Sequence, residues 1–268
     1  MHLNFHFSTA EVLWTLTFAA LLVLLVVLLG RNRLSRFPWF TASIALVALR
    51  LLASRLLFNK MDPLTSTRIF LVLADLVAVV SLLVLVEMAR RGFARASRTA
   101  WIAGTLVLVA AAGAVLAWWG PWPAWTTLTS GSTIANLKLM QLVEQKGDLL
   151  DSLLAVELCA LVILFGRYFN AGWRSHVQQI VFGLSTVSIV QLALRAVFQK
   201  IANGPPPASQ EEFTRITGLR DKLVNANSSV YLVVLLWWIV CLWIDEPWLK
   251  VNDAEPAAGA GAQQSPQN

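Results

Sequence analysis

Charged residues are scarce in this chain. Of its 268 residues, 13% are charged and 57% are hydrophobic, whereas soluble domains average about 25% charged and 45–50% apolar residues. This deficit excludes an ordinary soluble domain. The net charge of +6 does not indicate nucleic-acid binding, because the arginines gather in short loops between apolar runs, where they act as orientation signals.

Cysteine and histidine are also rare. Cys159 and Cys241 both fall inside apolar runs, so we expect buried thiols and no disulfide framework. His2, His6 and His176 show no ligand spacing, so no metal site is predicted. A retinal cofactor, which requires a lysine inside the last apolar run, is equally unexpected. The sequence therefore predicts neither a metal nor a cofactor.

The apolar residues form long blocks, which is the pattern of transmembrane helices. Seven blocks reach spanning length, at about 10–30, 38–58, 69–89, 99–119, 149–168, 177–200 and 223–244. They predict an all-α integral membrane protein with a bundle of seven transmembrane helices in one domain, residues 1–247. Residues 248–268 hold mostly small and polar residues and predict a disordered cytoplasmic tail.

The loops between the apolar runs alternate in charge. The first, third and fifth loops are short and basic, with Arg31, Arg33, Arg36, Arg90, Arg91, Arg95, Arg98, Arg167 and Arg174. Because cytoplasmic loops carry an excess of Lys and Arg, these loops are predicted to face the cytoplasm. The N-terminus then lies outside and the C-terminus inside, in the plasma membrane, a bacterial inner membrane by our expectation.

The fourth loop contains one further helix signal. After the Gly-Pro-Trp-Pro segment at 120–123, residues 132–146 repeat apolar positions at helical spacing, and Ser132 or Thr133 can cap them. We interpret this segment as one surface amphipathic helix lying on the outer face of the membrane. The alternative is a lid over an outward-facing cavity.

A short internal similarity suggests a duplicated arrangement. Residues 43–50 and 188–195 match at five of eight positions, each ending in an arginine, and the preceding runs both end in Gly-Arg. If the match reflects a repeat, the architecture is 3+1+3, with two parallel repeats joined by the fourth span. Similar apolar composition alone is the alternative explanation.

Ionisable residues inside the apolar runs are the main functional signal. Such a side chain costs about 2.5–3.5 kcal/mol at the bilayer centre and needs a partner or a water-filled cavity. The predicted spans place these residues in the outer half of the bundle: Arg50, Arg55, Asp75, Asp151, Glu157, Gln191 and Arg195. Three arginines then balance three carboxylates. Asp75 is the predicted partner of Arg50, because a short loop joins their spans.

This cluster has two interpretations. It can line an outward-facing polar cavity, where Arg50 and Arg195 bind a small anionic or zwitterionic ligand through planar guanidinium groups. The protein is then a small-molecule-binding transporter, or a sensor that signals through a protein partner. Alternatively, the ion pairs only order the helices, and the chain is a non-catalytic structural or assembly membrane subunit.

An enzyme acting on lipid is the third hypothesis. No nucleophile–base pair or metal-binding set supports it, so we do not expect an enzyme. The expected partners are the lipid bilayer, the small ligand and a partner protein, and nucleic acid is not among them. The nearly uncharged inner half gives no sign of a transport path, which favours a sensor or a scaffold over a transporter.

Overall fold

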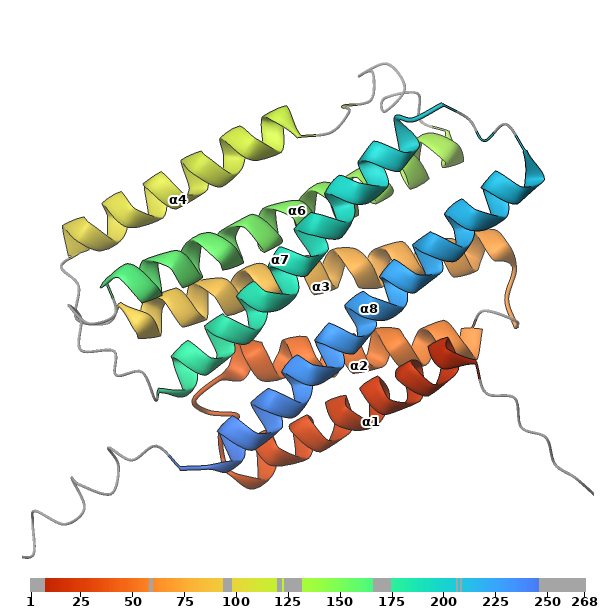
Figure 1. Cartoon of the computed structure of the whole chain (residues 1–268). Coiled ribbons are helices and arrows are strands. Elements are labelled where there is room, and N and C mark those ends of the chain that lie inside the picture. Colours follow the sequence, from red (N-terminus) through yellow and green to blue (C-terminus); the bar gives the residue numbers. More distant parts are fainter. Residues whose placement is uncertain are drawn as a thin grey trace, which may run out of the picture.

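The computed structural model describes residues 8–57, 60–93, 98–119, 122, 132–165, 175–205, 207 and 209–245, except for the side chains of residues 98, 100 and 101. Figure 1 shows their arrangement as a bundle of long helices. The predicted tail at 248–268 lies outside the described residues, as do three of the loop arginines, Arg95, Arg167 and Arg174.

Seven helices form the regular structure of the described residues. They are α1 (Thr9–Gly30), α2 (Pro38–Leu57), α3 (Pro63–Gly92), α4 (Arg98–Trp118), α6 (Thr133–Phe165), α7 (His176–Ala202) and α8 (Gln210–Trp243). Five of them, α1, α2, α3, α7 and α8, are long and apolar enough to cross a membrane. The all-α class and the membrane character expected from the sequence are therefore supported.

Six helices form a ring. Going around it, the order is α1, α2, α3, α6, α7 and α8, and α8 packs again on α1. Helices that follow one another in the chain run in opposite directions, so α1, α3, α6 and α8 all start at the end of the bundle that holds Thr9 and run toward the end that holds Gly30 (Figure 1). We call these the Thr9 end and the Gly30 end. Helix α4 lies outside the ring against α6.

The amphipathic segment at 132–146 is the first part of α6, so the expectation of a separate surface helix is wrong. Ser132 does cap it, since its Oγ accepts the Ala135 N–H at 3.1 Å, but the helix continues unbroken to Phe165. No proline interrupts residues 133–165. At Gly147 a Cβ would lie only 3.3 Å from Ala78 of α3. This close contact packs α6 against α3 directly after the segment.

The remaining helix, α4, is fastened to α6 at its last turn. The Lys146 ammonium donates to the backbone carbonyl of Trp119 at 2.6 Å and to that of Leu116 at 3.4 Å. It also lies 4.3 Å from the centre of the Trp122 ring. A cation bound to the last carbonyls of a helix satisfies acceptors that have no partner inside that helix.

An apolar core fills the ring toward the Gly30 end. Trp238 of α8 is 2% exposed and packs edge-on against Phe40 of α2, with ring centroids 5.1 Å apart. Its Nε1 donates to the Gln179 carbonyl at 3.2 Å. A Cβ at Gly183 would lie 2.3 Å from this Nε1, so only glycine leaves room for the indole. This core closes the interior below the candidate site.

Candidate functional site

Two arginines from opposite sides of the ring reach the same helix. Arg50 of α2 donates through Nη2 to Glu144 Oε1 at 3.0 Å. Arg195 of α7 donates through Nη2 to Asp148 Oδ2 at 3.2 Å and through Nη1 to the Gln145 carbonyl at 2.8 Å. Glu144 and Asp148 lie one turn apart on α6, so this helix connects α2 with α7.

The predicted pairing of Arg50 with Asp75 is wrong in this structure. The reason is the length of α6: it begins at Thr133, so residues that the prediction placed in a separate surface helix belong to α6 and lie beside the arginines. Long arginine side chains also extend toward polar surroundings, which here are at the Thr9 end. Asp75 keeps an Oδ1 without a hydrogen-bond partner.

Arg55 belongs to a different contact. Its Nη2 lies 3.4 Å from Glu11 Oε1, and its guanidinium carbon lies 5.7 Å from the centre of the Trp14 ring. The Arg55 side chain is 62% exposed, so this pair joins α1 to α2 at the surface. Exposed pairs of this kind contribute roughly 0–1 kcal/mol to stability.

Of the two carboxylates that bind these arginines, Glu144 lies nearer the Thr9 end and Asp148 lies one turn further along α6. Burial raises the pKa of the Glu144 carboxyl, while the charge of Arg50 opposes that shift and the nearby carboxylates of Asp148 and Asp75 add to it. Asp148 is also close enough to Asp75 and Asp151 for their charges to repel. Acidic groups therefore outnumber the two arginines at this level of the bundle.

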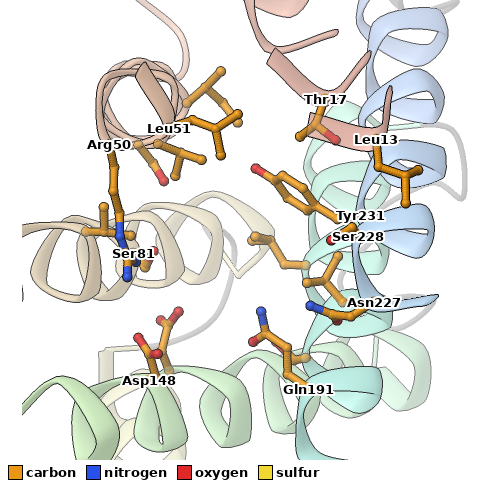
Figure 2. Close-up of a pocket in the computed structure, with 18 of the residues that line it drawn as sticks. Leu13, Thr17, Arg50, Leu51, Ser81, Asp148, Gln191, Asn227, Ser228 and Tyr231 are labelled. Carbon is orange, nitrogen blue, oxygen red and sulfur yellow. The ribbon is translucent and has the colours of Figure 1, made fainter. Parts of the chain in front are cut away.

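A cavity of about 450 Å³ lies within the ring, and Figure 2 shows residues that line it. It extends from Ala10 and Leu51, near the Thr9 end, to Phe40 and Trp238 at the core. Polar residues line it from every ring helix: Thr17, Ser43, Arg50, Ser81, Asp148, Asp151, Ser188, Gln191, Asn225, Asn227, Ser228 and Tyr231. Its size is within the range of about 300–1,000 Å³ typical of small-molecule sites.

Four residues that line the cavity hold buried polar atoms without hydrogen-bond partners. These atoms are Trp14 Nε1, Thr17 Oγ1, Asp151 Oδ1 and Asn227 Oδ1. Buried polar groups in proteins are nearly always hydrogen-bonded. Four such atoms on residues around one cavity show that the polar side chains here do not satisfy one another.

The seven residues predicted from the sequence separate into three groups. Arg50, Asp151 and Gln191 line the cavity, and Gln191 Oε1 accepts the Ser152 hydroxyl at 3.3 Å. Arg195 is connected to the cavity through Asp148. The other three, Arg55, Asp75 and Glu157, do not line it.

Sequence reasoning missed the carboxylates that bind the arginines, and it did not single out Thr17 of α1 or Tyr231 of α8. Glu144 and Asp148 could have been found from their spacing of four residues, which places both on one side of a helix. Thr17 and Tyr231 lie inside apolar runs, and no sequence signal separates them from ordinary packing residues.

The cavity offers hydrogen bonding and charge, with an apolar surface between the polar groups. Leu13, Val47, Val77, Leu184 and Val187 supply much of that surface. Among the described residues, no group of three or more His, Cys, Asp or Glu side chains is placed to hold a metal ion. The arrangement is typical of a site that binds a small amphipathic molecule.

No protein-family model matches this chain, and no curated protein or solved structure is significantly similar to it.

Proposed function

We propose that this chain is an integral membrane protein that binds a small molecule in the central cavity, as a transporter or as a sensor that signals through a protein partner. One observation carries the proposal: a cavity of about 450 Å³, lined from six helices, whose lining residues include four with unpartnered buried polar atoms. A structure that only needed to pack would fill such a space with apolar side chains, because close packing is more stable.

The proposal includes the membrane arrangement expected from the loop charges. All seven helices cross the plasma membrane, the N-terminus and the Thr9 end face outward, and the C-terminus lies in the cytoplasm. Helix α4 contributes the apolar stretch Ile102–Trp118, and α6 contributes residues 149–165. The cavity then communicates with the outer side, because the apolar core around Trp238 closes the inner side.

The order of helices in the ring supports two parallel repeats, α1–α3 and α6–α8. A half-turn that carries α1 onto α6 also carries α2 onto α7 and α3 onto α8, and it exchanges the α3–α6 contact with the α8–α1 contact. Arg50 and Arg195, which end the two matching sequence segments, then occupy equivalent helices. Transporters built from repeats bind substrate at the repeat interface.

A structural or assembly subunit is the second candidate. Its support is the pairing of Arg50 with Glu144 and of Arg195 with Asp148, since each pair joins two helices. Ion pairs of this kind can specify which helix faces which without any ligand.

Ligand-induced stabilisation tests the two candidates. The full chain in lipid nanodiscs is heated with a collection of small amines, carboxylates, alcohols and sugars, and its Tm is measured. A ligand that binds only the folded state stabilises it in proportion to the logarithm of its concentration. We expect some compounds to raise the Tm, and the variant Ser81→Leu, which places an apolar side chain in the cavity, to lose this response.

The matched control is Thr186→Leu, because Thr186 is exposed on α7 and does not line the cavity. This variant should respond to ligands like the unmodified protein. If no compound raises the Tm, or if Ser81→Leu responds as strongly as the control, the binding function is wrong and the structural subunit becomes the better explanation.

A further inference from the structure

The charged groups that line the cavity are not balanced. They are Arg50, Asp148 and Asp151. Arg50 is paired with Glu144, and Asp148 is paired with Arg195. Asp151 has no ion pair among the described residues, and its buried Oδ1 has no hydrogen-bond partner. The one charge that the cavity leaves uncompensated is therefore negative.

We infer that the cavity binds a small organic cation, a protonated amine, with Asp151 as its counter-ion. The inference rests on the proposed binding function and adds the chemical class of the ligand. An ionised carboxylate in a site of low dielectric is stable only with a positive partner. An ammonium group supplies both that charge and N–H donors for the carboxylate oxygen.

Other polar atoms of the cavity lining are hydrogen-bond acceptors that suit a ligand with several N–H donors. Asn227 Oδ1 is a second acceptor without a partner, and the Thr17 hydroxyl, on a residue that is 6% exposed, is a third. Figure 2 shows Thr17, Asn227 and the ring of Tyr231 turned toward the same space from α1 and α8. An ammonium bound at Asp151 carries up to three N–H donors, so it keeps donors for a further acceptor of the cavity wall.

The walls suit the rest of such a molecule. The aromatic rings of Trp14, Phe40, Tyr231 and Trp238 line the cavity together with aliphatic side chains. Cations bind favourably over aromatic faces. An amine with an apolar or aromatic body therefore matches both the charge and the surface of the site.

An anionic ligand fits this arrangement less well. The Arg50 guanidinium is already paired with Glu144, which accepts from Nη2 at 3.0 Å, so its charge is largely compensated before an anion arrives. The anion would also face the carboxylates of Asp148 and Asp151 in the same cavity. Like charges brought together in a desolvated site lower affinity strongly.

The test compares three matched series of probes on the full chain in nanodiscs at neutral pH: phenylalkyl amines, the alcohols of the same length, and the carboxylates of the same length. Affinity is measured by isothermal titration calorimetry. We expect amines to bind most tightly. Asp151→Asn keeps the shape but removes the charge, and should weaken amine binding by about tenfold or more, since bonds to charged groups are worth about 1.5–3 kcal/mol.

Asp75→Asn is the matched control. Asp75 is also a carboxylate with an unpartnered oxygen, but it does not line the cavity, so this variant should bind amines with an affinity within about twofold of the unmodified protein. Cooperative thermal unfolding of both variants establishes that they are folded.

The possible results separate the inference from the proposed function. If carboxylates or alcohols bind as tightly as amines, or if Asp151→Asn binds amines unchanged, the cation inference is overturned while the binding function stands. If no probe of any series binds and none changes the Tm, both are overturned.

Discussion

Arg50 and Glu144 are 94 positions apart in the sequence, yet Nη2 of the arginine lies 3.0 Å from Oε1 of the glutamate. The pair connects α2 to α6 across the α3 position of the ring. The side chains are 38% and 22% exposed, so the contact is partly shielded from water. It is one of two such contacts that α6 makes with arginines of different helices.

The first prediction concerns this pair. Arg50→Leu should lower the free energy of unfolding by about 1–3 kcal/mol, because it leaves the Glu144 charge without its partner in a partly buried place. Replacing both residues, Arg50→Leu with Glu144→Leu, should recover most of the loss. Unfolding in mixed detergent micelles measures both.

A double-mutant cycle on Arg55 and Glu11 is the control, since that pair is largely exposed, and its coupling should stay below about 1 kcal/mol. Equal coupling in both cycles would contradict the assignment of a shielded contact to Arg50. A rescue by Asp75→Leu instead of Glu144→Leu would show that the arginine has a different partner in the folded protein.

The second prediction concerns the core below the cavity. Gly183→Ala should destabilise the protein by about 1–3 kcal/mol, because the added methyl group overlaps the Trp238 indole and the core must shift. Adding Trp238→Phe should relieve part of the overlap. Thermal unfolding measures the effect, and Gly104→Ala on α4, where no atom lies within 4 Å of the new Cβ, should be nearly neutral. A loss as large at 104 as at 183 would argue against the steric explanation.

The third prediction concerns the first half of α6. Single cysteines at the exposed positions 138, 141 and 145 should react rapidly with a membrane-impermeant maleimide, while a cysteine at 135, where the native alanine is 2% exposed, should react slowly. This helical pattern should continue through Gly147 without interruption. Uniform rates from 133 to 148 would indicate a disordered loop, contrary to the continuous helix.

The fourth prediction concerns orientation. A fluorescent protein that matures only in the cytoplasm, fused after Asn268, should be bright if the C-terminus lies inside. An enzyme that is active only outside the cytoplasm, inserted between residues 122 and 132, should be active. A dark but correctly inserted C-terminal fusion would contradict the proposed count of seven spans.

The sequence was sufficient to predict the helices because burial in lipid leaves a strong signal. Each apolar run corresponds to one helix of the structure, from Thr9–Gly30 to Gln210–Trp243. Helix ends were predicted less well where a helix continues past its apolar part. Helix α8, for example, begins at Gln210, where Ser209 caps it by accepting the Glu212 N–H at 3.2 Å, well before the apolar run at 223.

The candidate site was predicted only in part, for the same physical reason. Hydropathy marks where lipid contact stops, and it says nothing about where helical hydrogen bonding stops. Glu144 falls in the segment predicted to be a separate surface helix, and Asp148 lies between that segment and the apolar run of α6, so the prediction matches the arginines with other carboxylates. Which carboxylate reaches a given arginine depends on how each helix is rotated about its axis and packed against its neighbours. The apolar pattern of one sequence does not show this rotation or packing.

The ring consists of two halves, α1–α3 and α6–α8, and these halves pack together where α3 meets α6 and where α8 meets α1. The cavity lies between the two halves. A molecule that touches Thr17 of α1 and Asp151 of α6 at the same time therefore bonds the halves to each other. Such a molecule binds most tightly to one relative position of the halves, and by thermodynamic linkage it makes that position the more populated. If the cavity binds a ligand as proposed, its occupancy is readable at the far ends of the helices as a change in the spacing of the two halves.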